Sequence, residues 1–288
     1  MRAYSTPDRS LPGQPDALTV GYGGEELRET AIRELTLREH STAVSEWLFA
    51  LHLFAVAFDP EREYNAADIG DDRVSRGAFE LRLELLALAS RAAKPALDLL
   101  LGGYYTEAWS LLRTMLELWA RSVYVRLKPE EFVRWYEADI EPMSVELHRR
   151  EPNWGEIANV IRRHGAQDDR GLFEEALLRW QLLNMGSKPS GEGITQIQQQ
   201  GANIIAFRNE YHPVLCQHTL SHGVFVQRAI LGELAQLGSH PQEWVEWNDK
   251  FAEVAESLIE AARPTMEEWV RSRHEERARR VGRRGSRV

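Results

Sequence analysis

The stretch from Gly103 to Leu127, GYYTEAWSLLRTMLELWARSVYVRL, decides the fold class. An α-helix turns by about 100° per residue, and on that wheel apolar side chains cover nearly the whole circumference. The polar residues fall on one narrow stripe: Thr106, Ser110, Arg113, Glu117 and Arg121. A helix of this kind is surrounded by protein on most sides. The stretch therefore predicts a central helix in an all-helical domain.

The rest of the 288-residue chain repeats helical periodicity. Alternation of β-branched residues never extends beyond a few positions, and no repeat recurs at a fixed period. We predict an all-α fold, with one domain of about eight to ten helices over residues 25–263 and no β-sheet. Residues 1–24 hold three prolines and are predicted to be a disordered lead-in. Residues 264–288 are predicted to be helical at first and then a disordered basic tail.

Several helix boundaries follow from capping and breaking residues. A break near Ser41 divides the first long helical stretch, with Ser41 as its cap, and Gly102–Gly103 ends a later one. Asn153 is a plausible cap, and Pro213 suits the first turn of a long helix. Pro264 is predicted to end one helix and to begin the last.

Composition limits the function classes. The net charge of −9 argues against nucleic-acid binding by the whole surface. The single cysteine, Cys216, cannot form an intrachain disulfide. The most apolar segment is the twelve residues Trp47–Phe58, which fall short of the ~20 needed to cross a bilayer. We therefore expect a cytoplasmic protein with no membrane partner.

The stretch Tyr211–Gly223, YHPVLCQHTLSHG, places three histidines in a predicted helix. His218 and His222 are four residues apart and share an apolar face with Leu215 and Phe225, so both imidazoles should be buried and can reach one ligand. Three interpretations follow: structural hydrogen bonding, a functional site without metal, or a metal site. His-x-x-x-His alone is a weak metal signal, and no third ligand stands nearby in the sequence. We predict no metal and no cofactor.

Arg113 and Glu117 on the central helix have two interpretations. In one they form a solvated i,i+4 pair, worth a few tenths of a kcal/mol. In the other they are an anchored pair inside a cleft that presents a fixed positive charge to an anionic ligand. We expect the helices 104–127 and 213–237 to pack together and to bring this pair towards His218 and His222.

Two segments, residues 99–125 and 208–223, resemble a group of uncharacterised bacterial all-helical proteins. That group has an L-x-x-G-x-x-x-E-A-x-x-L-x-R-x-x-x-E block, which Arg113 and Glu117 match, and a later Tyr…His helix, which Tyr211 and His222 match. The resemblance covers about residues 80–236. The pattern is also distantly similar to the HEPN proteins (higher eukaryotes and prokaryotes nucleotide-binding domains).

Similarity to HEPN proteins implies a metal-independent ribonuclease of bacterial defence or stress response, assembled as a homodimer. The HEPN hallmark is Arg, four to six residues, then His; here three residues separate Arg208 from His212. In that chemistry a histidine, His218 or His222, acts as general base on a ribose 2′-hydroxyl. An arginine, Arg113 or Arg208, stabilises charge on the phosphate.

The candidate residues therefore form two sets. The catalytic candidates are Arg113, Glu117, His218 and His222, and the binding candidates are Arg208, Tyr211 and His212.

The rival hypothesis is a non-catalytic helical interaction or ligand-binding protein, whose buried polar cluster only fixes helix register. Residues 271–288 contain eight arginines and two glutamates, a net charge of +6. This segment is either a solvated C-terminus or an electrostatic arm for RNA or an acidic partner. An arm of this kind is expected to lose affinity steeply as salt is raised.

Overall fold

The computed structural model describes residues 22–59, 69, 72–131, 152–187, 211–238 and 240–285, which contain eight α-helices and no β-strand. The helices are α1 (Tyr22–Glu39), α2 (Ser41–Ala57), α4 (Arg73–Leu101), α5 (Tyr105–Leu127), α7 (Trp154–His164), α8 (Gln167–Ser187), α10 (Pro213–Ala235) and α11 (Gln242–Gly285). The all-α prediction is confirmed for this part of the chain. The predicted lead-in up to residue 21 and the candidate Arg208 lie outside it.

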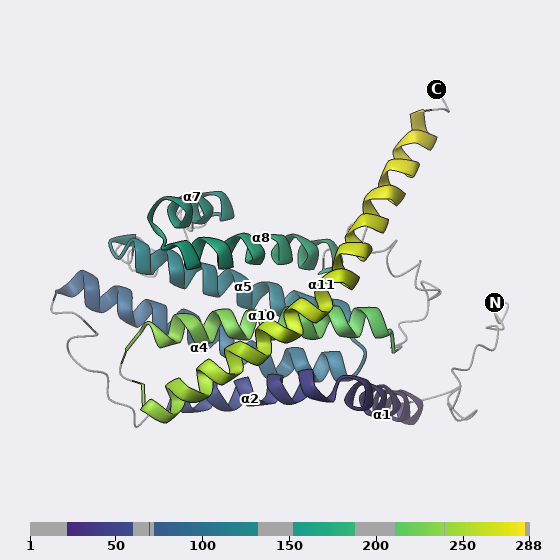
Figure 1. The fold of residues 1–288 in the computed structure, drawn as a ribbon, viewed down its shortest axis with the longest axis horizontal. Helices are drawn as coiled ribbons and strands as arrows, with labels where there is room; N and C mark the ends of the chain where they lie inside the picture. Colours follow the sequence, from purple (N-terminus) through teal and green to yellow (C-terminus); the bar gives the residue numbers. More distant parts are fainter. Residues whose placement is uncertain are drawn as a thin grey trace.

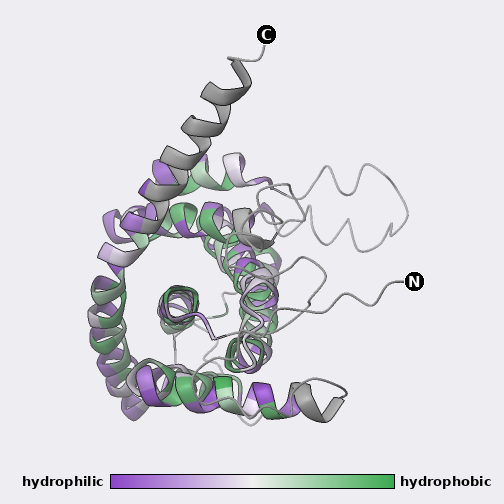
Figure 2. Cartoon of the chain, turned by 90° about the vertical axis from the view of Figure 1, so that its right-hand side faces the viewer, coloured by the Kyte–Doolittle hydropathy of each residue, from purple (hydrophilic) through white to green (hydrophobic). Residues whose placement is uncertain are grey.

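Helix α10 lies at the centre of the bundle. It contacts α2, α4, α5, α8 and α11, and Figure 2 shows it end-on inside a ring of helices. Seventeen of its 23 residues are buried, compared with twelve of 23 in α5. The sequence predicted a central helix at 104–127, but α10 is enclosed more completely and α5 is one of the helices that cover it (Figure 1).

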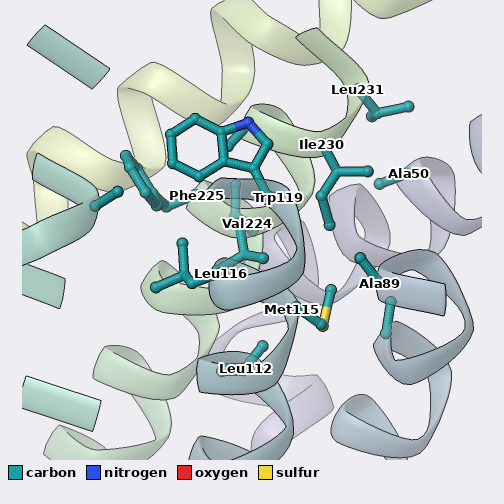
Figure 3. Close-up of a cluster of buried hydrophobic side chains, with 14 of the residues drawn as sticks. Ala50, Ala89, Leu112, Met115, Leu116, Trp119, Val224, Phe225, Ile230 and Leu231 are labelled. Atoms are coloured by element: carbon teal, nitrogen blue, oxygen red, sulfur yellow. The ribbon is translucent and has the colours of Figure 1, made fainter. Parts of the chain in front are cut away.

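The apolar core is shared by α2, α4, α5 and α10. Figure 3 shows Met115 and Leu116 of α5 close to Val224 and Ile230 of α10. All four side chains are fully buried. Burial of apolar area on this scale is the main stabilising contribution to such a bundle, at about 25 cal/mol per Å².

Gly223 lets α2 approach α10 closely. A Cβ at this position would lie 1.9 Å from a ring carbon of Trp47, which is fully buried. Trp47 also donates its indole N–H to the carbonyl of Ala93 at 3.1 Å, and its own carbonyl accepts from Gln227 at 3.2 Å. One hydrogen bond thus fixes the indole and the other fixes the backbone of Trp47, and glycine at position 223 leaves room for the ring.

Most predicted boundaries are confirmed. The α1–α2 break falls at His40, although no side-chain cap forms there. Gly103 has a φ of 82°, the left-handed conformation that favours glycine, and ends the turn after α4. Asn153 forms a capping box with Glu156 at the start of α7, and Pro213 stands in the first turn of α10.

The predicted break at Pro264 is wrong, because α11 continues through it to Gly285. A proline inside a helix removes one backbone hydrogen bond and disfavours the conformation of the residue before it. Here Ala262 and Met266, on either side of the exposed Pro264, are both buried against the bundle. Packing on both sides of the proline offsets the local cost and keeps the helix continuous.

Within the described ranges, no helix combines the length and the apolar character needed to cross a membrane.

Candidate functional site

The predicted histidine face of α10 is buried, as the helical spacing indicated. His218 and His222 are each 1% exposed, and Leu215 and Phe225 beside them are also buried. The central position of α10 explains this, because α2, α4, α5, α8 and α11 all pack against it.

The guanidinium that contacts His222 belongs to Arg179 of α8, which the sequence reasoning did not single out. Nη1 of Arg179 lies 3.2 Å from Nδ1 of His222 and donates to Oγ of Ser221 at 3.3 Å. Nε and Nη2 both donate to Oε1 of Glu175, at 3.0 and 2.7 Å. The guanidinium carbon lies 4.5 Å from the ring centre of Phe225. Arg179 has no exposed surface, so these groups replace the water that its charge would otherwise hold.

The contact with Arg179 defines the protonation state of His222. An arginine nitrogen only donates, so Nδ1 of His222 must accept and its proton must lie on Nε2. Burial, together with the positive charge of Arg179, lowers the pKa of His222 well below its ordinary value. His222 is therefore a neutral hydrogen-bond acceptor toward Arg179 at physiological pH.

His218 is neutral for a similar reason. Burial lowers its pKa to about 4, although a hydrogen bond with the backbone of Thr265 in α11 opposes the shift. The charges of His212 and Arg179 lower it further. His218 thus connects the central helix to α11 one residue beyond Pro264.

Helix α5 closes the other side of this cluster. The indole of Trp109 meets the His222 ring edge-on, with ring centres 6.0 Å apart, and donates to Oγ1 of Thr219 at 2.7 Å. Thr219 in turn donates to the carbonyl of Leu215 at 2.7 Å.

We call Arg179, Glu175, Ser221 and His222 the Arg179 cluster.

Arg113 and Glu117 lie at the interface of α5 with α8. Nε of Arg113 is 3.6 Å from Oε1 of Glu117, and both side chains are a little over a quarter exposed. Arg113 also donates to Asn184 at 3.2 Å, and Glu117 accepts from the indole of Trp180 at 2.9 Å. The predicted i,i+4 pair forms, but the carboxylate–guanidinium pair that reaches His222 is Glu175 with Arg179.

The binding candidates at the start of α10 act as a clamp. His212 caps the helix, because its Nδ1 accepts from the backbone N–H of Leu215 at 3.2 Å. Its own N–H donates to the hydroxyl of Tyr105 at 3.3 Å. The hydroxyl of Tyr211 donates to Glu39 and lies 3.3 Å from Nε2 of His40. These contacts join the starts of α2, α5 and α10 to the end of α1.

Cys216 lies one turn further along α10. Burial raises the pKa of its thiol to about 11, and its Sγ lies 3.8 Å from Oγ1 of Thr36. The thiol is therefore protonated at neutral pH and behaves as a small core side chain rather than a nucleophile.

A second buried polar centre lies towards the other end of α10, and the sequence reasoning missed it. Glu233 is 3% exposed and accepts from Arg82 of α4 at 2.8 Å and from Arg126 of α5 at 3.1 and 3.2 Å. Arg126 extends the network by donating to Asp169 of α8 at 2.8 Å. One carboxylate thus joins three helices, and a fourth joins through Arg126.

One signal in the sequence does identify Arg179. It follows Phe173 and Ala176 at intervals of three residues, and both of these are fully buried. The apolar stripe of α8 therefore contains an arginine, which predicts a buried charge that needs a partner. Glu175 lies four residues before Arg179, the spacing of an ordinary surface ion pair. In the sequence Arg179 therefore resembles a surface residue, although its side chain is buried.

Among the residues that the structure describes, no group of three or more His, Cys, Asp or Glu side chains is arranged to hold a metal ion. Comparison with models of protein families, with curated proteins and with solved structures returns no match.

Proposed function

We propose that this chain is a non-catalytic helical interaction protein. Its polar centres hold the helices in one register, and its contact with a partner is made outside the core. The observation that carries the proposal is the burial of Arg179 among its partners, of which Glu175 alone reaches the surface, with 28% of its side chain exposed. The guanidinium of Arg179 has no exposed surface and is committed to Glu175, Ser221 and His222.

A catalytic pair needs groups that the substrate can reach. A general base must offer a free lone pair within about 3 Å of the proton that it removes. Nδ1 of His222 already faces Arg179, and its other ring nitrogen carries the proton. An arginine that stabilises a phosphate needs donors directed at that phosphate. Arg179 directs its donors at its own neighbours instead, which supports a positioning role.

His212, the most accessible of the three α10 histidines, is committed in a similar way. Its Nδ1 caps the helix, so its Nε2 carries the proton in the neutral ring. Capping a helix N-terminus contributes about 1 kcal/mol to stability, which is a sufficient structural reason for a polar side chain here.

The HEPN-like ribonuclease is a second proposal, favoured by one observation. An arginine and a histidine do lie in contact, Nη1 of Arg179 being 3.2 Å from Nδ1 of His222. Catalysis there requires the cluster to open, so that the phosphate replaces Glu175 or Ser221 as the partner of Arg179.

One assay separates the two proposals. The full-length protein is incubated with single-stranded RNA and a chelator, beside Arg179→Met and His222→Gln variants whose folding is checked by circular dichroism. We expect intact RNA with all three proteins and lower melting temperatures for both variants. Cleavage by the wild-type protein that either folded variant loses would establish the ribonuclease and overturn the non-catalytic proposal.

A further inference from the structure

Helix α11 carries opposite charges on its two parts. Residues 242–268 hold eight carboxylates and two basic side chains, a net charge of −6, and we call them the acidic half. Residues 271–285 hold seven arginines and two glutamates, a net charge of +5, and we call them the basic half. Both belong to one continuous helix of 44 residues.

The acidic half lies on the bundle and presents its charge outward. Trp244, Phe251, Ala255 and Ile259 are buried against the other helices. Seven of the eight carboxylate residues are exposed: Glu243, Glu246, Asp249, Glu253, Glu260, Glu267 and Glu268. The eighth, Glu256, pairs with Arg228 of α10. The outer face of this half is thus a negatively charged strip about 40 Å long, at 1.5 Å per residue.

The basic half cannot neutralise that strip within one molecule. Because the helix continues through Pro264, the two halves are joined end to end and do not fold back on each other. Figure 1 shows α11 crossing the bundle and then continuing past it. A protein surface that complements both halves must therefore come from another molecule.

We propose that the partner is a second copy of this chain, and that two α11 helices pair antiparallel. This rests on the proposed interaction function and names its partner. A two-fold axis near the junction of the halves places each basic half against the other copy's acidic half. The same surface is used on both molecules, as a two-fold interface requires. The two contacts are identical, so every favourable charge pair occurs twice.

RNA fits this helix less well than a second copy does. Without residues 271–288 the chain has a net charge of −15, and the acidic half ends at residue 268, three residues before the basic half begins at residue 271. A polyanion on the basic half would therefore be repelled by the carboxylates of Glu267 and Glu268 at the end of the neighbouring strip. A partner that carries both signs in the reverse order satisfies both halves.

The experiment measures mass by light scattering with the full-length protein at about 50 mM and about 1 M salt. Screening shortens the Debye length to about 3 Å at 1 M, so we expect a dimer at low salt and the 33.0 kDa monomer at high salt. One variant reverses the acidic half (Glu246→Lys, Asp249→Lys, Glu253→Lys), and the other reverses the basic half at three arginines on the same side of the helix as the acidic strip (Arg271→Glu, Arg279→Glu, Arg283→Glu). Each alone should weaken dimerisation at least about tenfold.

Two further samples make the test specific. The two variants mixed should form a heterodimer, and both sets of changes in one chain should restore the homodimer. Glu34→Lys, Glu80→Lys and Glu84→Lys together give the same change in net charge at exposed positions on α1 and α4, and should leave the dimer intact.

A monomer at low salt would overturn the antiparallel pairing, and so would a dimer that ignores the acidic-half reversal. If such a monomer instead binds single-stranded RNA through the basic half, the partner is RNA and the interaction function survives. If the protein is monomeric and also does not bind RNA, α11 gives no support to the proposal of an interaction protein.

Discussion

Helices α10 and α11 pack against each other but differ in the number and the burial of their charged side chains. Helix α10 carries only two residues charged at neutral pH, Arg228 and Glu233, and its histidines are buried and neutral. Each charge on α10 meets a named partner from another helix. On α11, the charged side chains that the structure describes, from Glu243 to Arg271, are all exposed except Glu256. A charge on α10 is therefore part of the packing, whereas the exposed charges of residues 243–271 of α11 can contact other molecules.

The reason is the dielectric environment of each helix. A carboxylate in the core loses its hydration and must recover that free energy from close, well-oriented cations, so its removal leaves those cations unpaired. A carboxylate at the surface keeps its water, and its ion pair contributes about 0–1 kcal/mol. The same residue type on two adjacent helices should therefore differ severalfold in its effect on stability.

The largest expected effect is that of Glu233→Gln. The change leaves the Arg82 and Arg126 guanidinium groups facing a neutral amide in a buried site, and we expect a loss of about 3–5 kcal/mol in the free energy of unfolding. Urea titration followed by circular dichroism measures it.

The matched control is Glu256→Gln on α11, whose ion pair with Arg228 is one-third to one-half exposed. Its cost should stay below about 1 kcal/mol. Equal losses for the two variants would contradict the contrast between the helices.

The second effect compares two glycines of α10. Gly223→Ala places a methyl group on the Trp47 ring, which is held by Ala93 and by the packing around it, and should cost about 3 kcal/mol. Gly232→Ala meets no atom within 4 Å and should stabilise the helix by about 0.5–1 kcal/mol. Thermal unfolding of both variants measures the pair. A stable Gly223→Ala protein would mean that α2 does not pack against α10 as closely as described.

The sequence predicted the all-α class and the buried histidine face because both depend on helical periodicity. His218 and His222 follow Leu215 at intervals of three and four residues, so one buried face includes all three. The cap at Asn153 is equally local, since it needs only Glu156 three residues later.

The partners of those histidines could not be predicted in the same way. Whether Arg113 or Arg179 reaches His222 depends on the register of α5 and α8 against α10, and periodicity within one helix does not determine that register. The predicted helix break at Pro264 was wrong for a related reason. The local preference of proline to end a helix was outweighed by the packing of Ala262 and Met266. The sequence thus predicts which face of a helix is buried more reliably than it predicts which charged side chain of another helix contacts that face.

The smallest of the three effects is a dependence of stability on pH, which arises from the buried histidines of α10. The pKa of His218 is about 4 in the folded state and about 6.5 in an unfolded chain, so the unfolded state binds more protons between these values. Stability should therefore fall as pH drops from 6.5 towards 4, by about 2–3 kcal/mol for His218 at pH 4.5. His222, whose pKa is also lowered by burial, acts in the same direction.

The His218→Gln variant isolates this contribution. Glutamine does not titrate, so the free energy of unfolding should depend less steeply on pH between 4.5 and 6.5 in the variant than in the wild-type protein. Urea titrations at several pH values give both slopes. Parallel slopes would mean that His218 is protonated in the folded state, and the link from α10 to the backbone of Thr265 would then need a charged imidazole in the core. Because the shift arises from burial at the centre of the bundle, the difference in slope should persist at high salt, where contacts among the charges of α11 are screened.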